Sequence, residues 1–386
     1  MKRYYFKIKQ GLYRRKAKTI IIILTVLLLF SFVYIGTVSV SFFANAADYV
    51  VRPIIGSRNT VTLESLFFGV SDTTKQVVSK FSSPSKNVFA NENTKLIKQT
   101  LRQMSNPQLL GLSPMPSLTS LHPFPNEGVW SPIVFDRFQN QILMAKTIVS
   151  PDPQRNYAYV ALVKMAMSKL SIAVVAGGVQ PGGPIGNPGT GIIPWAIASN
   201  KKLIAAFNGG FQYKDGEYGM TIGNKTYVPL RKNLATFVIY KNGSVNIIKY
   251  QGQDLSNTIA TRQNGPMLIE NGTIISYTEN GMDTWGLTVT NSMYTWRSGI
   301  GITKNGNLIY AVGPSLIPQT LAKALQKAGA VNAMQLDINP YWVRFVLFHL
   351  QSQGTYSYKP LLHKMTNGGY AYLHGYQKDF FYIYTK

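Results

Sequence analysis

In this 386-residue chain, several polar residues stand at the ends of apolar runs, where a buried strand can deliver a side chain to a surface. Asn208 closes the run 203–207 and is followed by Gly209, Gly210 and Phe211. Glycines permit positive φ angles and have no Cβ, so a ligand can approach this backbone closely, while the Asn208 amide offers a donor and an acceptor. The segment is therefore a candidate binding turn; an ordinary Asn-Gly hairpin turn is the alternative.

Two arginines and one aspartate stand at further predicted strand ends. Arg262 and Asn264 precede one apolar run, Arg297 and Ser298 precede a second, and Asp337 closes a third. A guanidinium binds phosphate oxygens through paired hydrogen bonds, and a carboxylate at a strand end is a common catalytic group. Together these residues predict a site for an anionic ligand beside one carboxylate. Taken singly, an ordinary structural cation and a turn-capping aspartate are the alternatives.

In this order, the segments resemble the phosphodiester glycosidase family, one member of which removes N-acetylglucosamine from a sugar phosphodiester. The resemblance extends from about Thr147 to the C-terminus. It is carried by the Asn-Gly-Gly-Phe turn, the Arg-Ser segment before Gly299, and the stretch 329–337. It implies hydrolysis of a sugar-1-phosphodiester. Because phosphate is a good leaving group, cleavage of this bond depends less on a strong general acid than cleavage of an ordinary glycoside does.

The resemblance also implies roles for individual residues. Asp337, Asn208 and Arg297 are the implied catalytic residues. The implied substrate-binding residues are Gly209, Gly210, Phe211, Arg262, Asn264, Ser298, Asn339 and Trp342. The histidines show no metal-ligand spacing, so we assign no metal ligand and no cofactor, with a divalent cation near Asp337 as an open alternative.

The turn after Asp337 departs from the family pattern. Many members carry a glycine-rich, serine-containing turn there, whereas this chain continues with Ile338, Asn339, Pro340, Tyr341 and Trp342. The difference predicts a divergent branch and leaves two interpretations open. One is a hydrolase acting on an extracytoplasmic glycan, and the other is a non-catalytic glycan-binding or envelope polysaccharide assembly protein with the same fold.

A basic N-terminal stretch precedes a long uncharged run. Residues 1–18 carry eight Lys or Arg and no acidic residue, and residues 20–43 carry no charge. As a helix rising about 1.5 Å per residue, this run is long enough to cross a bilayer. We therefore expect a cytoplasmic tail at 1–18, a transmembrane anchor at 19–43 and an extracytoplasmic remainder of a cell-membrane protein. A signal peptide cleaved after Ala46 is the alternative.

The remaining chain is strongly basic. The net charge is +24 from 39 basic and 15 acidic residues, so 31 basic residues remain beyond the tail. This excess favours an anionic or phosphodiester-linked glycan as partner over nucleic acid, for which no base-reading motif is present, with simple solubility as the alternative. There is no cysteine, which excludes disulfides, thiolate metal sites and a cysteine nucleophile. The sequence leaves the oligomeric state open.

The pattern along the chain predicts a stem and Pro-rich linker at 44–140 and a phosphodiester glycosidase-like domain at 141–386. A single clear helix is expected at 318–327, ending before Gly329. We expect an α+β fold, with a mixed β-sheet and few helices. Strands are expected at 157–167, 170–175, 203–207, 235–240, 245–250, 265–269, 299–302, 308–312 and 331–336.

Overall fold

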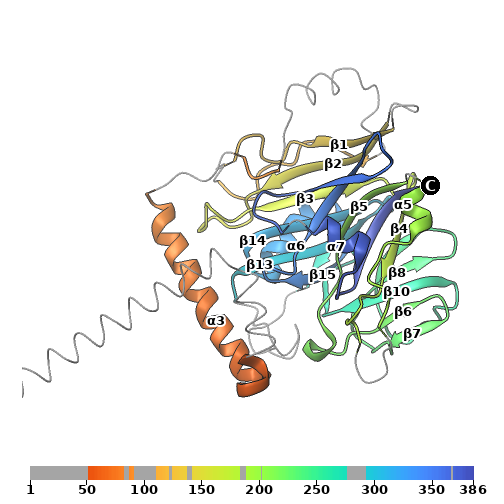
Figure 1. Ribbon diagram of the computed structural model, residues 1–386. Helices are drawn as coiled ribbons and strands as arrows, with labels where there is room; N and C mark the ends of the chain where they lie inside the picture. The colour runs from red at the N-terminus through yellow and green to blue at the C-terminus, as the bar shows by residue number, and fades with distance from the viewer. Residues whose placement is uncertain are drawn as a thin grey trace, which may run out of the picture. The chain divides into compact units, whose positions relative to one another are not determined.

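The computed structural model describes most of the chain from residue 51 onward (Figure 1). The described residues are 51–81, 87–90, 110–120, 124–136, 141–182, 188–200, 202–275, 293–366 and 368–386. The tail at 1–18 and the anchor at 19–43 lie outside them. None of the helices within these described ranges has both the length and the apolar character needed to cross a membrane.

The chain divides into two compact units, residues 1–67 and 68–386. Helix α3 (Arg52–Ser79) crosses this division, and its C-terminal part belongs to the second unit. There Asp72 accepts a hydrogen bond from Arg155 Nε at 2.9 Å and another from the Tyr157 hydroxyl at 2.9 Å. The second unit therefore includes residues that precede position 141.

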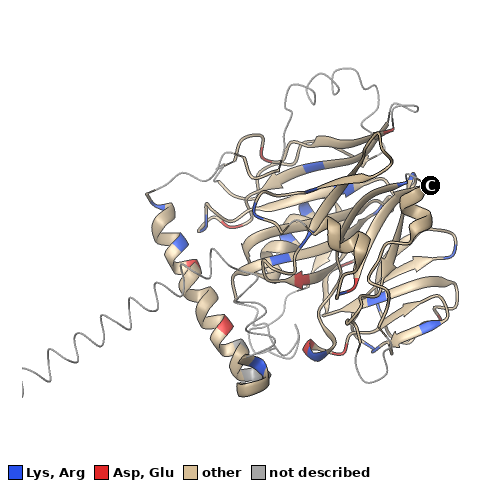
Figure 2. Cartoon of the chain, viewed as in Figure 1, with Lys and Arg blue, Asp and Glu red and all other residues tan. Residues whose placement is uncertain are grey.

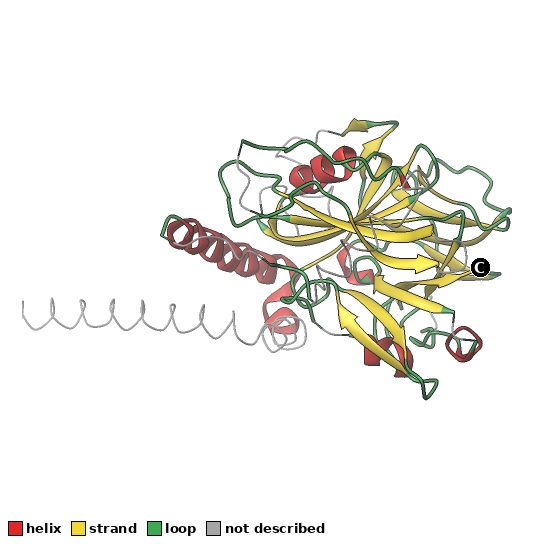
Figure 3. Ribbon diagram, turned by 90° about the horizontal axis from the view of Figure 1, so that it is seen from above, coloured by secondary structure: helices red, strands yellow, loops and turns green. Residues whose placement is uncertain are grey.

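Three sheets make up most of the second unit (Figure 3). The first has the strand order β1 (Ser131–Asp136), β2 (Gln141–Val149), β3 (Val160–Met165), β14 (Leu308–Leu316), β13 (Thr295–Thr303), β15 (Ala330–Ile338), β11 (Met267–Glu270) and β12 (Thr273–Ile274). The second has the order β7 (Lys225–Val228), β6 (Met220–Ile222), β10 (Thr258–Asn264), β8 (Ala235–Tyr240) and β9 (Val245–Lys249). The third has the order β17 (Tyr356–Pro360), β16 (Phe345–Leu350), β5 (Leu203–Asn208), β18 (Phe380–Thr385) and β4 (Leu170–Val175).

Strand pairing differs in one respect from the expectation. Throughout the described part of the chain the strand pairs are antiparallel, so the mixed sheet expected from the sequence is corrected. A parallel pair needs a long crossover, and helix α6 (Pro318–Lys327) provides one between β14 and β15. These two strands lie on opposite sides of β13, so they do not pair with each other.

The described helices are few and mostly short. Helix α6 has the bounds predicted for it, and a left-handed Gly329 with φ 97° follows its end. Its buried Leu321 and Leu325 face Gly299 of β13, where an added Cβ would lie 3.1 Å from a Leu321 methyl carbon. The remaining short elements are α5 (Trp195–Ser199), the 3-10 turn η3 (Tyr213–Asp215) and α7 (Gly369–His374).

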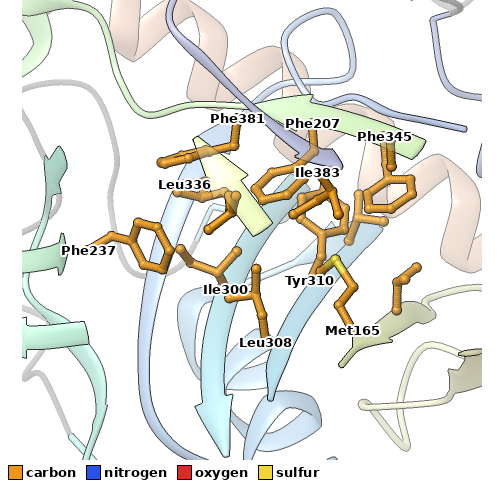
Figure 4. Packing of buried hydrophobic residues seen from close by; sticks show 14 of the residues in the cluster. Met165, Phe207, Phe237, Ile300, Leu308, Tyr310, Leu336, Phe345, Phe381 and Ile383 are labelled. Atoms are coloured by element: carbon orange, nitrogen blue, oxygen red, sulfur yellow. The ribbon is translucent and has the colours of Figure 1, made fainter. Parts of the chain in front are cut away.

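An apolar core joins the three sheets (Figure 4). Phe207 of β5 stacks on Phe345 of β16 at 5.9 Å and contacts Tyr310 of β14 at 5.0 Å between ring centroids. Phe381 of β18 contacts Phe207 at 5.3 Å and Phe237 of β8 at 5.3 Å. Successive residues of a strand point to opposite faces. The buried rings therefore also determine which face of each strand carries the polar residues next to them.

Candidate active site

Asp337 lies one residue before the end of β15 and is 3% exposed. Its Oδ2 forms an ion pair with Lys378 Nζ, and its Oδ1 accepts a hydrogen bond from the Ile338 backbone N–H at 2.9 Å. Burial raises the pKa of Asp337 to about 6, with Lys378 acting in the opposite direction. The carboxyl group therefore exchanges its proton near neutral pH.

Lys378 connects Asp337 to the aromatic residues of the turn that follows β15. Its Nζ lies 4.5 Å from the ring centroid of Trp342, a cation–π contact. Trp342 is 6% exposed and packs edge-to-face on Tyr341 at 4.5 Å between centroids. Asp337 and Trp342 are thus brought together, as predicted, through a lysine that the sequence interpretation did not include.

Asn208, at the end of β5, has its amide fully engaged within the protein. Its Nδ2 donates to Ser298 Oγ at 3.0 Å, and Ser298 Oγ donates to the Asp337 carbonyl oxygen at 2.9 Å. Its Oδ1 accepts from the Tyr310 hydroxyl at 2.9 Å and from the Arg344 backbone N–H at 3.1 Å. These bonds join β5, β13, β14 and β15, so Asn208 positions Asp337.

Glycine is needed at positions 209 and 210, but not for the positive φ angles or the close approach of a ligand that the sequence suggested. Neither has a positive φ angle. A Cβ on Gly209 would lie 2.0 Å from Asp379 Oδ2, and one on Gly210 would lie 3.0 Å from an Arg262 terminal nitrogen. The turn therefore needs glycine because Asp379 and Arg262 pack directly against its backbone, and the Gly210 N–H donates to Asp379 Oδ2 at 3.2 Å.

Arg262, in β10, is 1% exposed and binds Asp379 through two hydrogen bonds. Its Nε lies 2.8 Å from Oδ2 and its Nη2 lies 3.1 Å from Oδ1. The same guanidinium donates to the carbonyl oxygens of Phe211 at 2.8 Å and Gln263 at 2.6 Å. Its predicted role in holding phosphate would require substrate to replace these bonds.

Arg297, in β13, is fully buried and binds uncharged oxygens. It donates to the Leu316 carbonyl at 2.8 Å, Gln335 Oε1 at 2.9 Å and the Met293 carbonyl at 2.9 Å. Burial lowers the pKa of Arg297 to about 9. No carboxylate among the described residues forms an ion pair with it.

Two asparagines shape the backbone around Asp337. Asn264 Nδ2 lies within 3.0 Å of the Gln335 and Leu336 carbonyl oxygens, and its Oδ1 accepts from the Phe211 N–H at 3.1 Å. Asn339 adopts a left-handed φ of 79° and accepts from the Tyr341 N–H at 3.0 Å through Oδ1.

The structure thus gathers most of the predicted residues into one network around Asp337. Lys378, Asp379, Tyr310 and Arg344 also belong to it, and the sequence interpretation assigned none of them a role in the site. Lys378 and Asp379 precede an apolar run, which is the same signal that picked out Arg262, so this pattern could have found them. Within the described residues, no three His, Asp or Glu side chains lie close enough together to hold a metal ion.

Residues 201–337 match the model of the phosphodiester glycosidase family. The family resemblance inferred from the sequence is confirmed over this segment, which contains Asn208, Arg297 and Asp337. The residues that follow it, including Trp342, Arg344 and Lys378, lie outside the matched phosphodiester glycosidase segment.

Solved structures that resemble the chain include the zebrafish N-acetylglucosamine-1-phosphodiester alpha-N-acetylglucosaminidase catalytic domain, auto-inhibited by its pro-peptide. The TM-score is 0.40 at 15% identity, covering 79% of this chain and 97% of that one. A hypothetical protein from Synechocystis gives a TM-score of 0.30 at 13% identity and covers 59% of each chain. Among curated proteins, none matches this chain.

Proposed function

We propose that this protein hydrolyses the bond between a sugar and phosphate in a sugar-1-phosphodiester. The observation that carries the proposal is Asp337. It is a buried carboxyl group with a pKa raised to about 6, and it lies at the end of the matched phosphodiester glycosidase segment. It is also tied to two other segments, through the ion pair with Lys378 and the hydrogen bond from Ser298 Oγ to its carbonyl oxygen. Perturbed carboxyl groups held in this way are typical of glycoside-cleaving sites.

In the proposed reaction, the ionised carboxylate of Asp337 stabilises the positive charge that develops at the anomeric carbon. The C1–O bond breaks and the phosphate monoester leaves with the bonding electrons. Water then adds to C1 and passes its proton to the departed phosphate monoester. The ammonium group of Lys378 favours the ionised form of Asp337 at neutral pH. Trp342 contacts Lys378 Nζ through its ring, so it lies beside this carboxylate, where the sugar would bind.

We further propose that the substrate is part of an anionic glycan outside the cytoplasm, at the cell membrane to which residues 19–43 anchor the chain. Beyond the tail, 31 basic and 15 acidic residues leave a net charge of +16 (31 − 15), which supports an anionic partner. Basic residues are spread over several strands and loops of the second unit (Figure 2). This spread suits a long polyanion better than one small ion.

One observation favours a second candidate, a glycan-binding or polysaccharide assembly protein without catalysis. Arg262 and Asn208 already form intramolecular bonds that occupy them, and Arg297 donates to three oxygens of the protein itself. Groups that are satisfied within the fold have less capacity to bind a transition state.

The two candidates are separated by measuring sugar release from a panel of sugar-1-phosphodiesters. We expect turnover by the wild-type protein and its loss in Asp337→Asn, since the amide cannot supply the negative charge. Asp254→Asn is the matched control, because Asp254 is exposed and hydrogen-bonded only to nearby Ser256. A folded wild-type protein that binds glycan and releases no sugar would eliminate the hydrolase and leave the binding role.

A further inference from the structure

Arg344, which immediately precedes β16, is a buried guanidinium with few polar contacts. It is 5% exposed, and its Nη2 lies 3.5 Å from the Tyr341 carbonyl oxygen, at the outer limit for a hydrogen bond. Its Nε is buried and has no hydrogen-bond partner among the described residues. Instead, the guanidinium carbon lies 4.7 Å from the ring centroid of Tyr376 and 5.6 Å from that of Tyr341.

Two tyrosine hydroxyls near Arg344 are also unsatisfied. Tyr372, in α7, is fully buried, and Tyr376 is 7% exposed. Their rings pack edge-to-face at 5.3 Å between centroids, and within the described residues neither hydroxyl has a hydrogen-bond partner. Burial raises the pKa of both hydroxyls, while the charge of Arg344 acts in the opposite direction on both.

The nearby carboxylates are already engaged. Asp337 is paired with Lys378, and Asp379 is paired with Arg262. Among the described residues, Arg344 therefore has no carboxylate partner for its charge. A buried charge and two buried hydroxyls without partners are each costly, so together they indicate a site that an anion completes.

The backbone of Arg344 places this group beside the candidate catalytic residues. Its N–H donates to Asn208 Oδ1 at 3.1 Å, and its carbonyl oxygen accepts from the Asn208 N–H at 3.1 Å. Asn208 is linked through Ser298 to Asp337. The unsatisfied group is thus fixed by backbone bonds to the same network that holds the carboxylate.

We propose that Arg344, Tyr372 and Tyr376 form the subsite that binds the phosphodiester group of the substrate. This inference rests on the proposed function, and it places phosphate recognition outside the matched segment 201–337. The guanidinium and the two hydroxyls donate hydrogen bonds to the non-bridging phosphate oxygens, while the sugar ring extends toward Asp337 and Trp342. Arg262 and Arg297 then retain their intramolecular bonds.

The sharpest test uses Tyr372→Phe and Tyr376→Phe, which remove hydroxyls that have no partner in the free protein. We expect thermal stability to be unchanged or raised in both variants. The dissociation constant for the methyl phosphodiester of N-acetylglucosamine 1-phosphate, measured by calorimetry, should rise about tenfold or more in each variant, because each loses a hydrogen bond to a charged group. Binding of the neutral methyl glycoside of N-acetylglucosamine should be unaffected.

A second variant and a control test the guanidinium. Arg344→Lys keeps the positive charge and loses the planar donor geometry, so it should weaken phosphodiester binding about tenfold or more. Lys359→Gln removes a cation at an exposed position of β17 and should leave binding unchanged.

Three results would overturn the subsite. They are no binding of the phosphodiester or of inorganic phosphate by the wild type, unchanged phosphodiester affinity in all three variants, and equal weakening of the neutral glycoside. Turnover measurements distinguish failure of the proposed hydrolysis from failure of the subsite. If the variants lose phosphodiester affinity while the wild type shows no turnover, the subsite stands and the hydrolase falls. If the wild type turns over with a KM that the variants do not change, the hydrolase stands and the subsite falls.

Discussion

Arg262 and Arg344 are two buried guanidinium groups at strand ends of the same candidate site, and their surroundings differ. Arg262 is bound along one edge by both carboxylate oxygens of Asp379 and donates to three carbonyl oxygens, one of them at 3.5 Å. Arg344 has one long contact to a carbonyl oxygen and otherwise faces aromatic rings. A cation at a strand end is therefore not by itself a ligand for substrate. What its neighbours leave unsatisfied decides its capacity to bind.

The largest effect should come from breaking the satisfied pair. Asp379→Asn leaves the buried charge of Arg262 without its carboxylate, so we expect the free energy of unfolding to fall by about 3–5 kcal/mol. Urea denaturation at neutral pH measures it. Arg344→Met, which removes the guanidinium that has few partners, should lower the free energy of unfolding by less. If it destabilises the fold as much as Asp379→Asn does, then Arg344 is as well satisfied as Arg262 and the contrast between the two regions is lost.

The pH dependence of the free energy of unfolding should show an effect of intermediate size, which comes from the titration of Asp337. Because its pKa is raised to about 6 in the folded state, from about 4 unfolded, the native state binds the extra proton between these values. Its contribution to stability is therefore complete below about pH 4 and is lost as pH rises through 6, a change of at most about 3 kcal/mol. Unfolding measured from pH 4 to 7 should show this loss in the wild type relative to Asp337→Asn. Parallel pH profiles for the two proteins would show that Asp337 titrates normally.

The smallest effect should come from single hydroxyl groups. Tyr310→Phe removes a donor to Asn208 Oδ1 and should lower the free energy of unfolding by about 1–2 kcal/mol. Tyr376→Phe removes a hydroxyl without a partner among the described residues and should cost nothing. Thermal unfolding of both variants measures the difference. Equal destabilisation would mean that the Tyr376 hydroxyl is bonded in solution and is not held open for a ligand.

Local patterns predicted much of the fold. Helix α6 has the expected bounds because its apolar face and the following Gly329 are both readable locally. The nine expected strands are present; β4 and β8 have the expected bounds, and the bounds of the others differ by a few residues. Strand pairing was harder to predict from the sequence, because it depends on which distant segments meet. The expected mixed sheet proved to be antiparallel among the described strands.

The candidate site was predicted in part. Asn208, Ser298 and Asp337 do lie together in one network. Asn208 and Asp337 lie at or next to the ends of their strands, as expected, whereas Ser298 lies inside β13. The apolar run after Lys378 and Asp379 marks them as polar residues at a strand end, but nothing near them in the sequence shows that β18 runs beside β5 and brings them to the site. The difference between Arg262 and Arg344 could not be predicted either, since spacing does not reveal which hydrogen-bond partners a buried cation will find.

The position of β18 has a consequence for how the protein is made. This strand is the last of the described strands, yet it lies between β5 and β4, which are synthesised much earlier. During N-to-C synthesis the facing edges of β4 and β5 therefore wait unpaired, as open templates for mispairing. Lys378 and Asp379 arrive immediately before β18, so the closing of the sheet and the neutralisation of Asp337 and Arg262 happen in one late step. A nascent chain that stalls before this point exposes a split sheet and two uncompensated charges, which marks it for chaperones or proteases.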